Sequence, residues 1–198
     1  MILFSDHGEI LADRGVTFCH GFSLHDEEVH VPLIIRHPRM AKGVRIKNQV
    51  QLIDVMPTLF DLLGVDKKPA QIEGKSLVSL MNGHLTGELN KYVYAECLSG
   101  ESEKEDVLNF QAMARSARWK LISSVWKSRS GAVVADMAPK TITLHNFAVV
   151  SLPAKDSFEL YDLEKDQKEN ANLTGLADKK IEGDLLSNLL IFSDDLAD

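Results

Sequence analysis

The chain has 198 residues, of which 44% are hydrophobic and 26% are charged, and its formal net charge is -7. This size and balance predict a globular protein of one domain, or of one domain with a small appendage. The acidic balance argues against general nucleic-acid binding, which needs a basic face, and no apolar run approaches the ~20 residues of a membrane span.

The first apolar stretch ends abruptly in polar residues. Met1 to Phe4 predict a buried strand, and Ser5-Asp6-His7-Gly8-Glu9 follows it as a loop. In open α/β sheets, ligands bind just beyond the carboxyl ends of the strands. A carboxylate and an imidazole at that rim, Asp6 and His7, can together hold a divalent cation. A strand followed by an Asp-containing turn without a ligand is the alternative.

Residues 9–30 predict a long loop, because they are polar, rich in histidine and acidic residues, and interrupted by Gly15 and Gly21. Long loops inside compact domains are usually functional. Within this loop, His20 can swing back over Asp6. A cationic or hydrogen-bonding side chain there would stabilise the charge of a tetrahedral oxyanion. An ordinary surface histidine is the alternative.

The other polar residues of this region are expected in supporting roles. Glu9 and Asp13 are candidates to orient His7, with solvent exposure as the alternative for Asp13. His25 and His30 are expected to bind the neighbouring acidic residues or solvent. The remaining histidines are expected to be structural, namely His37, His84 and His145.

Two helices and a second strand follow. Residues 31–36 predict a buried strand. Residues 54–63 have the apolar spacing of a helix, with Pro57 in its first turn and Gly64 as its C-terminal stop. Residues 76–81 predict a further short helix.

The pattern changes near residue 90. An exposed acidic loop is expected over residues 99–107, and an amphipathic helix over 185–192. Alternation predicts strands over residues 91–97, 111–117, 119–125, 131–136, 141–151 and 158–163. The expected fold is therefore α/β, with a domain of residues 1–90 followed by a smaller antiparallel β subdomain with a C-terminal helix over residues 91–198.

Seven short segments carry a family resemblance. They are Phe4 to Glu9, His20 to Leu24, Val31 to Ile35, Asp54 to Leu59, Glu73 to Leu77, Ala114 to Leu121, and Phe158 to Leu163 with Asp166, Glu169 and Asn172-Leu173. In this order they resemble the C-terminal half of sulfatases, within the alkaline-phosphatase-like superfamily. The resemblance covers nearly the whole chain and implies part of an alkaline-phosphatase-like α/β sheet at its front.

The resemblance also implies roles for individual residues. Asp6 and His7 match the late pair of metal ligands of the family. His20 matches the position where sulfatases place a Lys or His that contacts a sulfate oxygen. The implied metal is Ca²⁺, with Mg²⁺ or Mn²⁺ as alternatives. The implied reaction is hydrolysis of a small-molecule or saccharide sulfate ester, in which the metal polarises the sulfuryl oxygens.

Two family features have no counterpart in this sequence. The family nucleophile is a Cys converted to formylglycine, or a Ser, in a C/S-x-P-S-R segment, and neither Cys19 nor Cys97 lies in such a segment. The early pair of metal-binding aspartates has no match either. The chain is therefore expected to be the C-terminal part of a longer sulfatase, inactive alone. It is also expected to self-associate or to pair with the missing N-terminal half, because strand 1–5 would otherwise expose unpaired backbone groups.

Other functions stay open. The same superfamily contains phosphonate and phosphodiester hydrolases and phosphoethanolamine transferases. The segments around Trp119 and Tyr161 favour a sulfatase, or a sulfatase-like phosphonate hydrolase, over the transferases. A non-catalytic interaction module would explain the lack of a nucleophile, but the intact Asp6, His7 and His20 argue against it. The two cysteines lie in no metal-ligand or redox spacing, which indicates free thiols.

Overall fold

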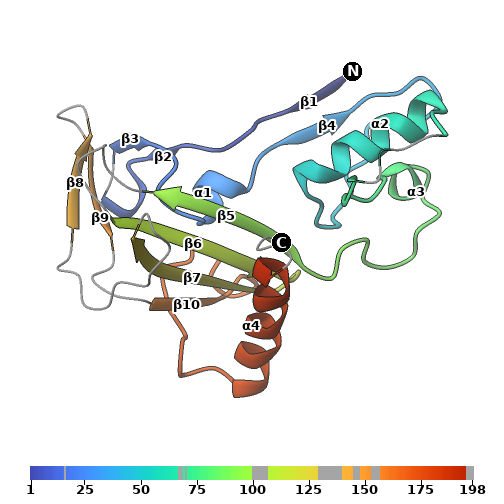
Figure 1. The fold of residues 1–198 in the computed structure, drawn as a ribbon. Helices are drawn as coiled ribbons and strands as arrows, with labels where there is room; N and C mark the ends of the chain where they lie inside the picture. Colours follow the sequence, from blue (N-terminus) through green and yellow to red (C-terminus); the bar gives the residue numbers. More distant parts are fainter. Residues whose placement is uncertain are drawn as a thin grey trace. The chain divides into compact units, whose positions relative to one another are not determined.

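The computed structural model describes residues 1–15, 17–66, 69, 71–99, 107–128, 140–144, 148–152 and 157–194 (Figure 1). The chain forms two compact units. Unit 1 contains Met1–Asp6 and Pro32–Val93, and unit 2 contains His7–Val31 and Tyr94–Asp198. The domain boundary expected at residue 90 stays a prediction, because a compact unit need not fold independently of its neighbour.

Unit 1 begins with two short antiparallel strands. β1 (Ile2–Phe4) pairs with β4 (Leu33–Ile35), and Leu3 lies opposite Ile34. Both strands were predicted, but the expected burial is wrong for both, since Leu3 in β1 is 49% exposed and Ile34 in β4 is 54% exposed. Among the described residues β1 has only β4 as a partner, and a two-stranded sheet is too small to bury its own apolar side chains.

The helices of unit 1 lie where the sequence predicts them. A 3-10 turn η2 (Leu52–Asp54) leads into α2 (Val55–Leu63), and a short α3 (Val78–Met81) follows. α2 ends at Gly64, whose φ of 69° is in the left-handed region that glycine adopts at little cost. The predicted helical stop at this glycine is confirmed.

Unit 2 is built on a four-stranded sheet. The strand order is β10 (Ser157–Asp162), β7 (Trp119–Ser128), β6 (Val107–Arg115), β5 (Val93–Ser99). β7 is antiparallel to both of its neighbours. The helix α4 (Lys179–Asp194) packs against β6 and β7 and is longer than the predicted 185–192 (Figure 1). The antiparallel subdomain with its terminal helix is thus confirmed.

A separate pair of strands, β8 (Lys140–Leu144) and β9 (Ala148–Leu152), accounts for the strand predicted over 141–151. The predicted strand over 131–136, the acidic loop over 101–106 and His145 lie outside the described residues. Within the described part of the chain, no helix has the length and apolar character that crossing a membrane requires.

The predicted loop over residues 9–30 is wrong, because regular structure interrupts it. It contains β2 (Ile10–Leu11), a 3-10 turn η1 (Asp13–Gly15), β3 (Thr17–Cys19) and a one-turn helix α1 (Asp26–Val29). β2 and β3 form an antiparallel pair. Strands of two or three residues are too short to show the alternation from which strands are predicted.

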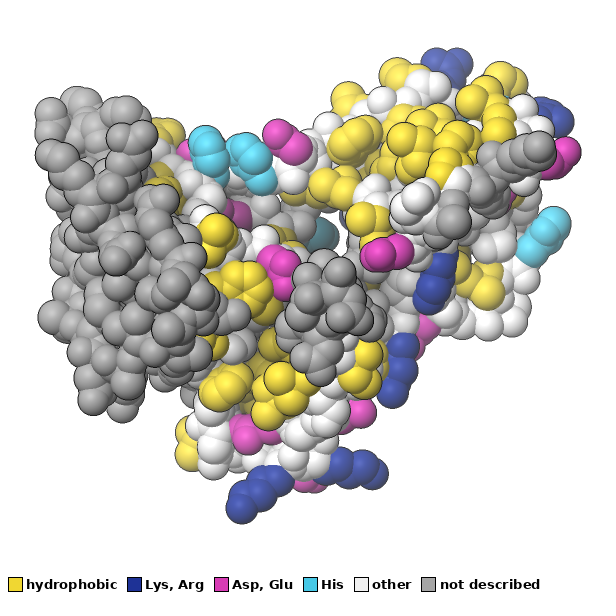
Figure 2. All heavy atoms as spheres, in the orientation of Figure 1, with side chains coloured by type: hydrophobic (Ala, Val, Ile, Leu, Met, Phe, Trp, Pro, Cys, Tyr) yellow, Lys and Arg dark blue, Asp and Glu magenta, His cyan; other side chains and the backbone are white. Residues whose placement is uncertain are grey.

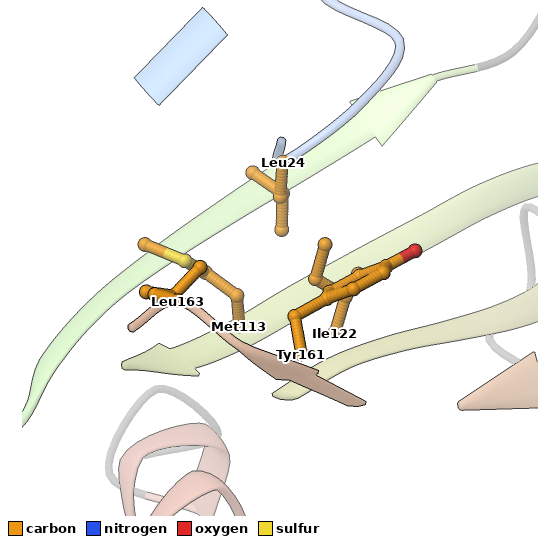
Figure 3. Close-up of a cluster of buried hydrophobic side chains, with 5 residues drawn as sticks. All are labelled: Leu24, Met113, Ile122, Tyr161 and Leu163. Atoms are coloured by element: carbon orange, nitrogen blue, oxygen red, sulfur yellow. The ribbon is translucent and has the colours of Figure 1, made fainter. Parts of the chain in front are cut away.

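A hydrophobic cluster joins this N-terminal segment to the sheet of unit 2. Leu24, which is 2% exposed, packs with Met113, Ile122, Tyr161 and Leu163 (Figure 3). Burial of each such side chain contributes about 1.5–3 kcal/mol. The segment that carries His7 and His20 is therefore fixed to the C-terminal sheet, although roughly a hundred residues lie between them in the chain.

Candidate functional site

Three side chains of unit 2 converge at the start of the β2–β3 pair. Nitrogen or oxygen ligand atoms of His7, Glu9 and His20 all lie within 4.8 Å of one another. The strand register explains this: Ile10 lies opposite Cys19, so that Glu9, before Ile10, comes beside His20, after Cys19. His20 thus lies beside His7 and Glu9, and the expectation that it reaches over Asp6 stays a prediction.

The two imidazole rings are stacked, with centroids 4.2 Å apart and an angle of 25° between their planes. Nδ1 of His20 lies 3.0 Å from Oε2 of Glu9, and Nδ1 of His7 lies 2.7 Å from the carbonyl oxygen of Gly8. The Glu9 carboxylate oxygen and the Gly8 carbonyl oxygen both act as hydrogen-bond acceptors, so Nδ1 of each histidine is the donor and carries a proton. In a neutral imidazole the lone pair is then on Nε2. Metal-ligating histidines are commonly held in this way.

The cluster lies at the surface. The His20 side chain is 53% exposed and the Glu9 side chain is 37% exposed, and Figure 2 shows two histidine side chains next to each other on one face of the molecule. An ion pair this exposed contributes at most about 1 kcal/mol. The attraction between Glu9 and His20 is therefore too weak to build the cluster, and the backbone must hold these residues together.

The remaining predicted residues lie as follows. Asp6 has an exposed side chain at the end of the segment after β1, and it belongs to unit 1. Its role as a metal ligand beside His7 stays a prediction. Oε2 of Glu9 lies 3.0 Å from Nδ1 of His20, and the expected role of Glu9 in orienting His7 stays a prediction. Asp13 accepts a hydrogen bond of 3.3 Å from the backbone N–H of Leu11, which is a local turn contact.

His25 does not bind a neighbouring acidic residue, contrary to expectation. It is 9% exposed, and its Nε2 lies 3.2 Å from Oε2 of Glu159 and 3.4 Å from the hydroxyl of Tyr161. Burial raises the pKa of Glu159, but hydrogen bonds from His25 and Tyr161 outweigh it, so that this pKa is lowered overall. His30 does have the expected neighbour, since its Nδ1 is 3.8 Å from Asp26.

Both cysteines are free, as the sequence indicates. Burial, reinforced by the negative charge of Glu28, raises the pKa of the Cys97 thiol to about 11. Burial, Glu28 and Glu9 together raise the pKa of Cys19. Because the thiolate is the reactive form, neither side chain is prepared to act as a nucleophile near neutral pH.

The donor set of the cluster fits a divalent metal that accepts nitrogen. Two imidazoles and one carboxylate are the ligands that Zn²⁺ or Mn²⁺ takes, whereas Ca²⁺ prefers six to eight oxygens. Ca²⁺ would therefore need several further oxygen ligands besides His7, Glu9 and His20. The sequence singled out Glu9 only as a residue that orients His7 and not as a possible metal ligand, because a glutamate two residues after a histidine has no characteristic ligand spacing.

Comparison with known proteins agrees with the motifs. Residues 18–147 match the family model for the C-terminal part of N-sulphoglucosamine sulphohydrolase. Human arylsulfatase K is 28% identical over 124 residues, which is 62% of this chain and 23% of that protein. A choline-sulfatase from Rhizobium meliloti is 40% identical over 86 residues, 42% of this chain and 16% of the relative.

A solved structure of a 2-O GAG sulfatase has a similar fold. The TM-score is 0.65 at 25% identity, and the match covers 99% of this chain and 35% of that protein. The chain thus spans about a third or less of the length of these relatives. The fold is that of the alkaline-phosphatase-like enzymes, and the chain belongs to the sulfatase family, in which it corresponds to the C-terminal portion.

Proposed function

We propose that this chain is the C-terminal portion of an enzyme that hydrolyses sulfate esters, and that it contributes Asp6 and His7 to a metal site and His20 to sulfate binding. The observation that carries the proposal is the convergence of His7, Glu9 and His20 within 4.8 Å in a chain of the sulfatase family. The names of its relatives support a sulfate ester as the substrate, since arylsulfatase K and choline-sulfatase are both among them.

Each residue of the cluster has a distinct task in this proposal. A divalent cation, when bound, polarises the oxygens of the sulfuryl group. His7 offers the lone pair of Nε2 to the ion, because its Nδ1 proton is engaged by the carbonyl of Gly8. Glu9 fixes the ring of His20 through Nδ1. A protonated His20 can then donate from Nε2 to a sulfate oxygen, with Glu9 balancing its positive charge.

The nucleophile is proposed to lie outside these 198 residues. Supporting this, neither Cys19 nor Cys97 lies in a C/S-x-P-S-R segment, and the chain spans only a fraction of its relatives' length. The purified chain should then release no nitrophenol from 4-nitrophenyl sulfate, and the gene upstream of Met1 should encode a C/S-x-P-S-R segment. Turnover by the chain alone, or an upstream sequence without that segment, would contradict this proposal.

The identity of the metal is a separate proposal. The family resemblance favours Ca²⁺, while a nitrogen ligand such as the imidazole of His7 favours Mn²⁺ or a similar ion. Competition between Ca²⁺ and Mn²⁺ in calorimetric titrations of the whole chain distinguishes the two. Displacement of Mn²⁺ by stoichiometric Ca²⁺ supports Ca²⁺, and indifference to excess Ca²⁺ contradicts it.

Self-association of the isolated chain is proposed on the exposed apolar side chains of unit 1. Leu3, Phe4 and Ile34 are each about half exposed. A groove of about 450 Å³ in the same unit is lined by further apolar residues, among them Val44 and Ile46. Apolar patches of this kind mark contact surfaces. Light scattering should report a dimer that Leu3→Lys with Ile34→Lys converts to a monomer; a monomeric unmodified chain contradicts the proposal.

Particular results of these experiments would favour one of two other functions. An assembled enzyme that cleaves a phosphonate monoester faster than an aryl sulfate would be a phosphonate hydrolase of the superfamily. A chain whose metal affinity is unchanged by Asp6→Ala and by His7→Ala would be better described as a non-catalytic interaction module.

A further inference from the structure

We propose that Glu28 is the positioning residue that holds His7 and His20 together, by binding the residue that directly follows each histidine. The inference rests on the proposed function for the role of the two histidines in metal and sulfate binding. The placement of the two histidines by Glu28 follows from hydrogen bonds alone. Glu28 lies on α1 and does not belong to the cluster of His7, Glu9 and His20.

The main chain and the side chain of Glu28 each bind one of the two segments. The backbone N–H of Gly8, next to His7, donates to the carbonyl oxygen of Glu28 at 2.7 Å. The backbone N–H of Gly21, next to His20, donates to Oε2 of Glu28 at 2.5 Å, and the N–H of Phe22 lies 3.4 Å from the same oxygen. Because hydrogen bonds to a carboxylate are about twice as strong as neutral ones, this contact can restrain the His20 segment.

The two glycines are matched to these contacts. A Cβ atom on Gly8 would lie 2.0 Å from the carbonyl oxygen of Glu27, so only glycine allows the backbone to approach α1 so closely. Gly21 has a φ of 81°, in the left-handed region that other residues rarely adopt. The thiol of Cys97 donates to the carbonyl of Gly21 at 3.2 Å. Both polar groups of the Gly21 backbone are therefore bound from within unit 2.

Burial makes Glu28 a costly residue at this position. The residue is 4% exposed, and within the described part of the chain its Oε1 is buried without a hydrogen-bond partner. Burial first, and the negative charge of Glu28 second, raise the pKa of Cys19 and the pKa of Cys97. An apolar side chain would fill the same space without that desolvation cost. The hydrogen bonds from the backbone N–H groups of Gly21 and Phe22 offset part of the desolvation cost of the carboxylate.

The sheet of unit 2 fixes α1 and therefore Glu28. The carboxylate of Asp26, at the start of α1, lies 2.9 Å from Nζ of Lys120 and 2.6 Å from Nη1 of Arg115. The backbone N–H of Asp26 donates to Oε2 of Glu169 at 2.9 Å. Arg115 and Lys120 are cross-strand neighbours in β6 and β7. A continuous set of polar contacts thus runs from the C-terminal sheet through α1 to both histidines.

The test compares Glu28→Ala and Glu28→Gln with Glu27→Ala in the full 198-residue chain. Glu27 is the matched control, because it is acidic and lies on α1, but its side chain pairs with Arg14 at 3.2 Å. The first readout is the NMR cross-relaxation between the ring protons of His7 and His20, which needs neither metal nor substrate. It should be present in the unmodified chain, lost in Glu28→Ala, and retained in Glu28→Gln and Glu27→Ala.

The second readout is the affinity for Mn²⁺ alone. Loss of an outer partner of a metal site typically weakens binding by about 10- to 100-fold, and Glu28→Ala should fall in that range while Glu27→Ala stays within about twofold. Thermal unfolding shows whether each variant is folded. If Glu28→Ala is not, Glu28→Leu, which fills the buried space without a carboxylate, takes its place with the same expected losses. Unchanged cross-relaxation in a folded Glu28→Ala chain would overturn the inference. Absent Mn²⁺ binding by the unmodified chain would instead count against the proposed function.

Discussion

Lys120 and Asp26 are 94 positions apart in the chain, yet Nζ of Lys120 lies 2.9 Å from Oδ1 of Asp26. Lys120 is fully buried and also lies 2.7 Å from Oε1 of Glu169. One ammonium group therefore joins β7, the segment after β10, and α1. Since α1 carries Glu28, the stability of this ion cluster and the geometry of the candidate site depend on the same contacts.

Lys120→Met should be strongly destabilising. Removal of one partner of a buried ion pair costs about 3–5 kcal/mol, because the opposite charges stay buried without compensation. The measurement is the free energy of unfolding in urea. Lys165→Met is the control, since Lys165 is 77% exposed and lies 3.9 Å from Asp162, and its effect should be within about 0.5 kcal/mol. Equal effects of the two substitutions would contradict the assigned role of Lys120.

Acid should destabilise the chain partly through Asp26. Burial raises the pKa of Asp26, but Lys120 and Arg115 together outweigh burial, so this pKa is lowered overall. The folded state then binds a proton less readily than the unfolded state, whose Asp titrates near pH 3.9. The contribution is complete above about pH 4 and is lost as the pH falls through the lower, folded value. Urea unfolding between pH 2 and 7 should show less acid dependence in Asp26→Asn than in the unmodified chain, and an identical dependence would refute this account.

Cys97 should react slowly with iodoacetamide. Its pKa of about 11 means that roughly one thiol in a thousand is ionised at pH 8. In a Cys19→Ser chain, where Cys97 is the remaining cysteine, the alkylation rate followed by mass spectrometry should rise about tenfold per pH unit from pH 8 to 10. A rate that levels off near pH 8.5, as for an ordinary exposed thiol, would show that burial and Glu28 do not perturb this residue.

Two glycine-to-alanine substitutions should have opposite effects on the stability of the folded chain. Gly8→Ala places a Cβ 2.0 Å from the carbonyl oxygen of Glu27, so the chain must move away from α1, at a cost of about 1–3 kcal/mol. Gly183→Ala in α4 meets no atom within 4 Å and should stabilise the chain by about 0.5–1 kcal/mol, because alanine favours helices. Thermal unfolding measures both effects. Stabilisation by Gly8→Ala would contradict the close approach of α1.

The sequence predicts the longer elements well. β7 and β10 have alternation over enough residues to be recognised, and α2 has both helical spacing and a glycine stop. The short elements β2, β3 and α1 escaped prediction because each contains at most four residues. The burial of β1 and of β4 was wrongly predicted. An apolar run shows that a strand would be stabilised by burial, but only the surrounding structure decides whether other parts of the protein cover it.

The candidate site could be predicted only in part. His7 and His20 were singled out as candidates from a strand end and from family motifs, since such signals are local in sequence. The role of Glu28 could not be predicted, because Glu28 and Glu27 are adjacent residues of the same type. They differ only in the contacts that their side chains make in the folded chain. The partner of His25 is 134 positions away, and no local pattern contains information about contacts at that separation.

The most direct test of the metal site is calorimetric titration of the full chain with Mn²⁺ and with Ca²⁺, comparing the unmodified protein, His7→Ala and His84→Ala. His84 has an exposed side chain in unit 1 and is the matched control. One of the two ions should bind saturably to the unmodified chain and to His84→Ala, and at least about tenfold more weakly to His7→Ala. Binding that is absent from all three proteins, or equal in all three, would contradict the assignment of His7 as a metal ligand.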